Sequence, residues 1–315
     1  MRFVDIRQEH RPNMTDIPRV EGPRPHGPIY YDNSLCDCQD LAHNSDGASA
    51  MRYSKGSLVL NPRRDLPILS RVVSARFIAH SQLFEFLRLG YAERDRQVFN
   101  WRMRRLVRHG LLQTRSIPYL APEPIYSITR AGALALESHG ELPFASWGYE
   151  RSASDLQVPH ALELNNIELA LCRGHERFSW MSESQVRCLH TYLPGHFAKV
   201  YDAVISVNLG GGDIQFALEY EATQKTFARY DKVRQEIESE QRFETFLYLT
   251  PSFDLLRALT RQLNSGRQRI LFGLVEEFKH KRWDATIYYA DFVSRPLRQV
   301  LVAAGVPRQP VLKCS

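Results

Sequence analysis

Alternating apolar and polar positions along residues 200–225 predict a β-hairpin. Two alternating runs flank a Gly-Gly-Gly-Asp turn at residues 210–213, and glycine between two such runs is a strong short-range signal for paired antiparallel strands. We expect Leu209 to pair with Ile214, which fixes the register. The apolar face of the hairpin would then contain Tyr201, Ala203, Ile205, Val207, Leu209, Ile214, Phe216, Leu218 and Tyr220.

Three acids fall on the opposite face of this hairpin, namely Asp202, Glu219 and Glu221. Carboxylates this close repel one another in a low-dielectric setting, and the usual remedies are a shared proton or a bound cation such as Mg²⁺ or Mn²⁺. Lys225 follows the second strand and is a candidate to stabilise negative charge on a phosphate. The pattern favours a metal-dependent nuclease site in which the three acids hold the metal. The alternative is an ordinary amphipathic hairpin with a solvated acidic face.

Helical periodicity dominates residues 66–139. It predicts helices over Leu66–Ile78, Ser81–Leu89 and Glu93–His109, then short strands over Leu111–Ser116 and Ile125–Thr129, and a helix from Arg130 to about His139. Ser81 is the expected N-cap of the second helix, and Gly110 is expected to end the third. Three helices followed by a two-stranded wing are typical of a winged helix-turn-helix.

The third of these helices carries the predicted DNA contacts. Its apolar stripe, Phe99–Val107, is expected to face the core, and six arginines lie between residues 93 and 109. In a winged helix the third helix enters the major groove, where arginine contacts phosphates and guanine edges. The predicted contacts on this helix and on the first wing strand are Arg94, Gln97, Trp101, Arg104, Arg105, Arg108 and Arg115. Trp101 would either stack on a base or sugar or pack against a neighbouring domain.

The charge distribution supports a nucleic-acid partner. Residues 52–130 contain fifteen Lys and Arg against five Asp and Glu, whereas the rest of the 315-residue chain contains 26 against 30. A concentrated positive field is the usual footprint of a nucleic-acid-binding module, because neutralised phosphates release counterions. The predicted partner is double-stranded DNA. The alternative is an arginine-rich face that only keeps the protein in solution.

Composition divides the chain into four parts. Residues 1–65 are rich in proline and polar residues, and we expect a disordered tail that folds on a protein partner. The winged helix would occupy residues 66–140, a low-complexity linker residues 141–155, and a second domain residues 156–315. No run approaches about eighteen apolar residues, and the five cysteines are odd in number and scattered. We therefore expect a cytoplasmic protein without a membrane partner or a disulfide framework.

The order of elements in the second domain resembles that of a known nuclease superfamily. The pattern predicts helices over Pro159–Glu176, Thr226–Ser239 and Phe253–Asn264, and strands over Phe178–Cys188, Thr245–Thr250 and Ile270–Val275, with the hairpin after the first strand. This αβββαβαβ order resembles the core of the PD-(D/E)xK, or restriction-endonuclease-like, superfamily. The resemblance implies an α/β (α+β) fold with catalytic residues on the second and third strands and on the first helix.

Residue by residue, this resemblance implies roles for acids along the domain. Asp202 would be the acid of the second strand, and Glu219 or Glu221 that of the third. Glu168 or Glu163 would be the supporting acid on the first helix. All of these would be catalytic, and the strand acids would also bind the metal.

The chain departs from the superfamily pattern at the catalytic lysine. That lysine normally stands two residues after the strand acid, but here Glu221 follows Glu219 at this spacing and Thr223 follows Glu221. Lys225, or Lys232 in the next helix, would have to replace it. The departure leaves open whether the site is active.

A series of short motifs extends the resemblance to the replication-relaxation family of plasmid and mobile-element proteins. The motifs, in order, are Ser127–Gly132 (SITRAG), His160 with Asn165, Trp180 with Glu183, Tyr201–Val204 (YDAV), Glu219 with Glu221 and Thr223, and Tyr248–Thr250 (YLT). Some members of that family are mobilisation relaxases that nick DNA with a nuclease-like site, and others are DNA-binding proteins. A tyrosine relaxase usually brings a histidine triad, and this chain has no His-x-His cluster.

Three functions follow from these features. The first is metal-dependent DNA nicking, relaxase-like, in the mobilisation or replication of a plasmid or other mobile element. The second is a non-enzymatic winged-helix regulator whose degenerate nuclease-like domain serves homodimerisation or partner contact. The third is an accessory subunit of a larger assembly, recruited through residues 1–65.

Overall fold

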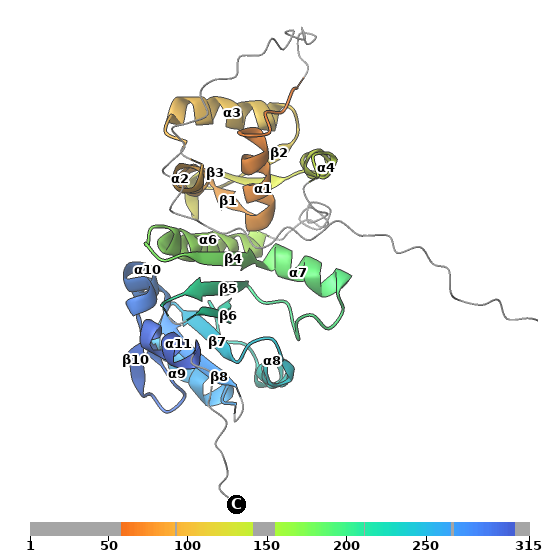
Figure 1. Cartoon of the computed structure of the whole chain (residues 1–315). Helices are drawn as coiled ribbons and strands as arrows, with labels where there is room; N and C mark the ends of the chain where they lie inside the picture. The colour runs from red at the N-terminus through yellow and green to blue at the C-terminus, as the bar shows by residue number, and fades with distance from the viewer. Residues whose placement is uncertain (1–57, 92, 141–154, 211, 266–267, 306–315) are drawn as a thin grey trace, which may run out of the picture.

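The computed structural model describes residues 58–91, 93–140, 155–210, 212–265 and 268–305. Over this part of the chain the fold is mixed α/β, with ten helices, a three-stranded sheet and a seven-stranded sheet (Figure 1). The expected α/β class is thereby confirmed. Most of the predicted tail, residues 1–57, and nearly all of the predicted linker, residues 141–154, lie outside the described residues.

The first unit contains the helices and strands predicted for residues 66–139, with one additional strand. Its elements are α1 (Asp65–Ala75), β1 (Ile78–Ala79), α2 (His80–Gly90), α3 (Arg96–Arg108), β2 (Leu112–Ile117), β3 (Ala121–Ile128) and α4 (Arg130–Ser138). Strands β1 and β2 pair antiparallel with β3, which lies between them. The helices enclose this small sheet around a core that includes Phe99, Met103 and Leu106, each at most 1% exposed.

The end of α1 and the start of α2 both differ from the sequence prediction. The first helix ends at Ala75 rather than Ile78, because Arg76 has a positive φ of 61° and Ile78 pairs with β3. Ser81 is not the N-cap, since α2 already begins at His80. The Ser81 hydroxyl and backbone N–H instead donate hydrogen bonds to Glu123, at 2.5 and 2.8 Å.

Local caps explain the bounds of α3. The Asp95 side chain accepts hydrogen bonds from the backbone N–H groups of Gln97 and Val98, at 2.8 and 3.0 Å, so it satisfies two of the free donors at the helix start. At the other end Gly110 has a φ of +69°, a conformation that suits glycine and stops the helix. The predicted stop at Gly110 is confirmed.

The second unit is built on the seven-stranded sheet, whose order is β10-β9-β8-β7-β6-β5-β4. Its elements are α6 (Val158–Cys172), β4 (Phe178–Ser182), α7 (Glu183–Tyr192), β5 (Ala203–Asn208), β6 (Asp213–Tyr220), α8 (Phe227–Ser239), β7 (Thr245–Thr250), α9 (Phe253–Gln262), β8 (Arg269–Leu274), α10 (Val275–Lys281), β9 (Thr286–Tyr288), β10 (Ser294–Pro296) and α11 (Leu297–Gly305). One face of the sheet packs on α6, α10 and α11, and the other on α7, α8 and α9.

The predicted hairpin is present as β5 and β6, but its register differs by two residues. Val207, not Leu209, pairs with Ile214. A shift of two keeps every side chain on its face, so the apolar face from Ala203 to Leu218 is as predicted. Tyr201 is the exception: it lies before β5 and packs with the core on the other face of the sheet.

The strand predicted over residues 178–188 is wrong in its second half. Strand β4 ends at Ser182, and α7 begins at the next residue. The Ser182 backbone N–H donates a 2.8 Å hydrogen bond to the Gln185 side chain, an arrangement that favours a helix start. Elements α10, β9, β10 and α11 follow β8 and were not predicted.

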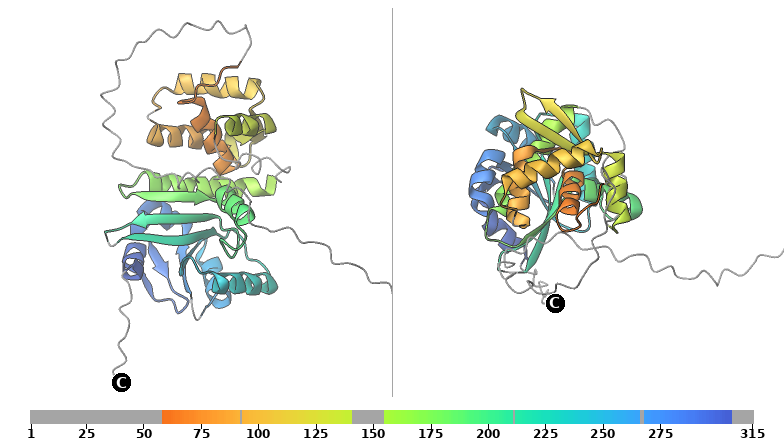
Figure 2. Two further views of the ribbon diagram at one scale, coloured as in Figure 1. Left: turned by 45° about the vertical axis from the view of Figure 1, so that its right-hand side comes forward. Right: turned by 90° about the horizontal axis from the view of Figure 1, so that it is seen from above.

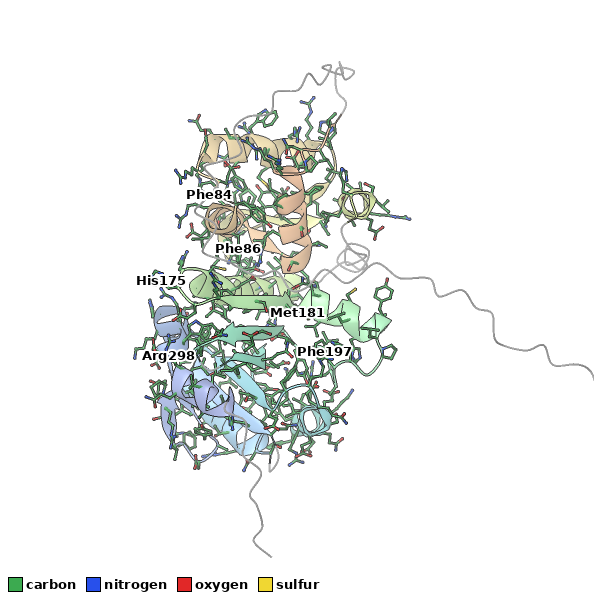
Figure 3. All side chains as sticks on the ribbon, in the orientation of Figure 1. Phe84, Phe86, His175, Met181, Phe197 and Arg298 are labelled. Atoms are coloured by element: carbon green, nitrogen blue, oxygen red, sulfur yellow. The ribbon has the colours of Figure 1, made fainter. Side chains whose placement is uncertain are left out.

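The two units meet where α6 packs against α2 and α7 packs against α1 (Figure 1). Side chains fill the space between α2 and α6, where Phe86 lies (Figure 3). Arg71 of α1 forms a bidentate ion pair with Glu168 of α6, and its guanidinium also lies 3.5 Å from the centre of the Phe86 ring. Both charged groups are buried, at 9% and 2% exposure, so the interface contains a largely desolvated charge pair.

We expect Glu168→Gln to lower the free energy of unfolding by about 3–5 kcal/mol, because it removes the carboxylate charge that pairs with the buried Arg71 guanidinium. The double variant Arg71→Met/Glu168→Met should recover most of the loss, since apolar groups of similar volume need no compensation. Urea denaturation measures both values.

Glu85→Gln is the matched control, because Glu85 forms ion pairs with Arg88 and Arg173 at the surface. It should cost less than about 1 kcal/mol. A Glu168→Gln protein as stable as the wild type would show that the buried pair does not hold the units together.

Candidate functional site

The three predicted acids meet at one end of the β5–β6 hairpin. Asp202 stands immediately before β5, while Glu219 lies near the end of β6 and Glu221 follows that strand. The Asp202 carboxylate accepts a 2.8 Å hydrogen bond from the backbone N–H of Tyr220, which joins the two strands at this point. Burial raises the pKa of both Glu219 and Glu221, and the nearby charge of Asp202 adds to the rise. The structure therefore brings together the acids that the hairpin pattern predicted.

Each of these carboxylates pairs with a cationic or protonatable side chain. The pairs are Asp202 with His160 of α6 (3.0 Å), Glu219 with Lys199 (2.7 Å) and Glu221 with Lys225 (2.6 Å). Lys225 thus lies where the sequence placed it, next to the acids. Lys232 does not, because it is 77% exposed on α8 and its partner is Glu236 at 3.8 Å.

Lys199 is the functional candidate that the sequence analysis missed. It stands three residues before Asp202, in the segment between α7 and β5, and its side chain is only 14% exposed. The superfamily spacing points only to positions after the strand acid, and Lys199 precedes that acid. A lysine close to the strand acid in sequence was the available signal.

Burial and charge shift the pKa values of this cluster in opposite directions. Burial raises the pKa of Glu219 to about 7, although Lys199 acts to lower it. Burial would also raise the pKa of Asp202, but the hydrogen bond and charge of His160 outweigh it and lower that pKa. Burial acts to lower the pKa of His160, but the hydrogen bond and charge of Asp202, together with the charges of Glu183 and Glu219, outweigh it and raise that pKa. Near neutral pH the cluster can therefore hold or release a proton at Glu219.

The arrangement does not fit a directly bound divalent ion. Within the described residues, no group of three or more His, Cys, Asp and Glu side chains is placed to hold a metal. Two lysines and a histidine pair with the carboxylates instead, which reduces the repulsion that suggested Mg²⁺ or Mn²⁺. A metal bound by all three acids would have to displace Lys199 and Lys225 from them.

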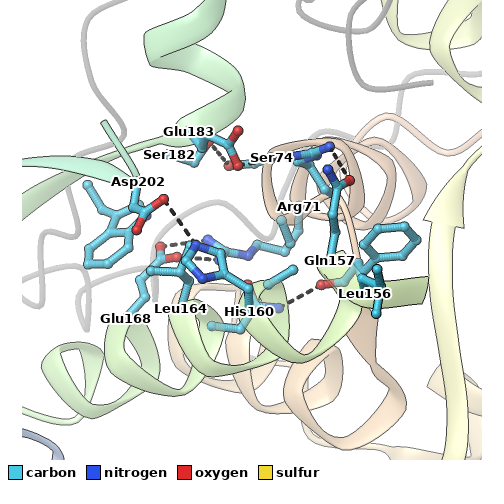
Figure 4. Close-up of a pocket in the computed structure, with 16 residues that line it drawn as sticks. Arg71, Ser74, Leu156, Gln157, His160, Leu164, Glu168, Ser182, Glu183 and Asp202 are labelled. Carbon is cyan, nitrogen blue, oxygen red and sulfur yellow. Dashed lines mark hydrogen bonds and ion pairs between the residues drawn. The ribbon is translucent and has the colours of Figure 1, made fainter. Parts of the chain in front are cut away.

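A polar pocket of about 230 Å³ lies beside the cluster, between α1, α6 and the β4–α7 junction. Figure 4 shows His160 and Asp202 pointing toward each other at this pocket, with the Arg71–Glu168 pair nearby. Glu168, the predicted supporting acid, thus lines the pocket but is held by Arg71 at the interface between the units. Glu163 pairs with Lys279 of α10 at 2.7 Å and does not line the pocket.

The second candidate site is the outer face of α3, together with Arg94, which lies just before the helix. Arg94, Gln97, Arg104 and Arg108 are exposed, and Trp101 is 56% exposed, so these five predicted contacts are accessible. Trp101 does not pack against the second unit; the Arg105 guanidinium lies 5.2 Å from its ring centre.

Two of the predicted DNA contacts are engaged within the first unit. Arg105 forms an ion pair with Asp65, which is 1% exposed, and donates a 3.3 Å hydrogen bond to the carbonyl of Val59. Arg115 is half-buried, with its guanidinium 5.2 Å from the Phe77 ring centre. Arg105 holds the segment before α1 against α3, which the sequence pattern could not show.

The outer face of α3 lies at one end of the molecule, whereas the carboxylate cluster lies near its middle, beside α6 (Figures 1 and 2). Helix α3 lies at the end away from the seven-stranded sheet, and α6 lies between that sheet and the first unit (Figures 1 and 2). A DNA segment lying across α3 would therefore be separated from the carboxylate cluster by α1, α2 and α6.

No family model matches the chain, and neither a curated protein nor a solved structure matches it. The resemblance to the replication-relaxation family and to the PD-(D/E)xK superfamily therefore stays a prediction. Among the described helices, none has the length and apolar character needed to cross a membrane.

We expect the His160–Asp202 pair to stabilise the protein over a defined pH range. The raised pKa of His160 means that its contribution is complete below 6.5, its ordinary value, and is lost as the pH rises through the raised value. The lowered pKa of Asp202 means that its contribution is complete above 3.8 and is lost as the pH falls through the lowered value. His160→Gln should therefore destabilise the protein more at about pH 5.5 than at about pH 8.5.

Urea denaturation of both proteins at the two pH values checks this difference. His280→Gln, which changes an exposed histidine on α10, is the control and should leave the pH profile unchanged. An equal loss of stability at both pH values would contradict the protonated pair.

Proposed function

We propose that this protein is a duplex DNA-binding protein of a plasmid or other mobile element, and that it binds DNA through the outer face of α3. The observation that carries the proposal is the uncompensated charge of this face. Arg94, Arg104 and Arg108 are all exposed, and none of them forms an ion pair with another described residue. Arg104 donates one hydrogen bond, from Nε to the Asn100 carbonyl at 3.3 Å, and its terminal N–H groups remain able to contact phosphates and guanine edges.

The arrangement of the first unit supports the same function. Three helices followed by the β2–β3 hairpin match the winged-helix order, in which the third helix enters the major groove and the wing lies along the backbone. Trp101, exposed on the same helix, adds an aromatic surface that can contact a sugar or base. The mobile-element context comes from the resemblance to the replication-relaxation family.

We expect Arg94→Ala/Arg104→Ala/Arg108→Ala to weaken duplex binding and to reduce the slope of log affinity against log salt by up to about three units, roughly 0.9 for each phosphate that the variant no longer neutralises. The fold should be unaffected because all three side chains are exposed. Arg105 is left in place, since its removal would break its ion pair with the buried Asp65 carboxylate. Fluorescence anisotropy at several salt concentrations measures the slope.

The matched control removes three exposed arginines from the second unit, Arg257, Arg261 and Arg295. It lowers the net charge equally and should keep the wild-type slope. If both triple variants behave alike, the effect is one of overall charge, and α3 is not the DNA surface.

A second candidate function is metal-dependent DNA nicking at the carboxylate cluster, for which the ion would have to displace Lys199 and Lys225 from the acids. The observation that favours it is the convergence of Asp202 and Glu219, from neighbouring strands, with a lysine 2.7 Å from Glu219. The buried hydroxyl of Tyr248, opposite Glu219 on β7, adds a donor without a hydrogen-bond partner among the described residues. Unsatisfied buried donors are rare and often mark functional sites.

The regulator alternative rests on different observations. The three carboxylates are already compensated by side chains, and α3 lies away from them. On this alternative the second unit serves dimerisation or partner contact, and the cluster has a structural role only.

A nicking assay separates the two. Supercoiled plasmid that the protein is first shown to bind is incubated with Mg²⁺ or Mn²⁺, with EDTA as the blank. Enzymatic nicking should fall on the order of a hundredfold or more in Asp202→Asn and in Lys199→Met, because each removes a charged group next to the reacting phosphate. Asp213→Asn, an exposed acid at the hairpin turn, is the control and should keep full activity.

Binding without any nicking that depends on Asp202 would leave the regulator as the function. A protein that neither binds duplex nor nicks it would reject both candidates.

A further inference from the structure

A second basic feature of the first unit lies beside α3, away from its outer face. A pocket of about 250 Å³ is lined by Arg63, Arg64, Arg102, Glu93 and Tyr91, together with two apolar side chains. We call it the Arg63 pocket. Arg63 and Arg64 precede α1, Arg102 lies on the inner side of α3, and Glu93 and Tyr91 belong to the connection between α2 and α3.

Tertiary contacts hold these arginines together. Arg102 is only 5% exposed and forms a 3.1 Å ion pair with Glu93, so its guanidinium is fixed at the base of the pocket. The segment that carries Arg63 and Arg64 is held along α3 by Arg105, which binds Val59 and Asp65 on either side of it. The pocket is therefore built by long-range contacts and is not a chance cluster on a flexible surface.

The charge of the pocket is not balanced. Three guanidinium groups and one carboxylate line the pocket, and that carboxylate, Glu93, already forms an ion pair with Arg102. Arg63 and Arg64 are exposed, and neither forms an ion pair with another residue in the part of the chain that the structure describes. The lining therefore offers two positive charges in excess.

The chemistry of the lining specifies the ligand. Guanidinium groups are donors only, so a ligand must supply acceptors and negative charge. Their planar fork matches phosphate oxygens in bidentate geometry, and several arginines around one site suit the oxygens of a phosphate group. The volume is below the range of about 300–1,000 Å³ that drug-sized ligands occupy, which favours a small anionic group.

We propose that the Arg63 pocket binds a phosphate group. The phosphate can come from the backbone of a duplex lying across α3 or from a free phosphate-bearing molecule, and the pocket chemistry is the same for both. The proposal does not depend on DNA binding through Arg94, Arg104 and Arg108.

The first arm of the test uses inorganic phosphate as the probe. Thermal unfolding of the full chain is followed as phosphate replaces chloride at constant ionic strength. The melting temperature of the wild type should rise by about 2–4 °C at saturation, because a ligand that binds only the folded state stabilises it. Arg63→Gln/Arg64→Gln should lose this rise, and these exposed substitutions should leave the fold intact.

The control for this arm is Arg261→Gln/Arg295→Gln, which removes two exposed arginines from the second unit. It should keep the wild-type response. An equal phosphate response in all three proteins, or none in the wild type, would overturn the proposal.

The second arm identifies the source of the phosphate. Duplex affinity is measured against salt for the same proteins. A slope reduced by about one unit in Arg63→Gln/Arg64→Gln alone assigns the pocket to a backbone phosphate. An unchanged slope, with the phosphate response lost, assigns it to a free phosphate-bearing molecule. If the wild type binds no duplex, the proposed function fails, while the first arm still tests the pocket.

Discussion

Burial of charged side chains is the constraint on which this structure depends. A carboxylate taken out of water needs a charged partner or several hydrogen-bond donors, because its desolvation otherwise costs several kcal/mol. Glu168 is satisfied by Arg71, which joins α6 to α1 and so joins the two units. Glu219 is satisfied by Lys199, which joins the segment before β5 to the end of β6. Compensation of buried charge thus organises both the interface and the candidate site.

Glu240 is a further buried carboxylate whose hydrogen bonds position a neighbouring segment of the chain. It is 2% exposed, and its carboxylate accepts hydrogen bonds from the Ala198 backbone N–H and the Tyr201 hydroxyl, at 3.0 and 2.9 Å. These two residues flank Lys199 in the segment that leads to Asp202. A carboxylate just after α8 therefore fixes the position of the lysine, although it makes no contact with Glu219 itself.

The functional surfaces are divided between the units. The outer face of α3 and the Arg63 pocket belong to the first unit and carry uncompensated positive charge. The carboxylate cluster belongs to the second unit and is internally compensated. This division is consistent with a protein that docks on DNA through one unit and uses the other for chemistry or for contact with a partner.

Local patterns in the sequence determined the hairpin, the helices of the first unit and the convergence of the acids. Period-2 alternation around a glycine turn fixes which side chains share a face, so the meeting of Asp202, Glu219 and Glu221 followed without knowledge of the rest of the fold. The two-residue error in register did not change which face each side chain occupies, because side chains on a strand alternate with a period of two.

Only the tertiary structure decided the partners of these residues. Arg71 and Glu168 are 97 positions apart, and Arg105 and Asp65 are 40 apart, so no local pattern connects them. The same distance effect made Arg105 look like a free DNA contact. Lys199 was missed for a different reason, because it precedes the strand acid and the superfamily spacing points to positions after it. Propensity and periodicity act over a few residues, whereas the pairing of buried charges is set by which segments the whole chain packs together.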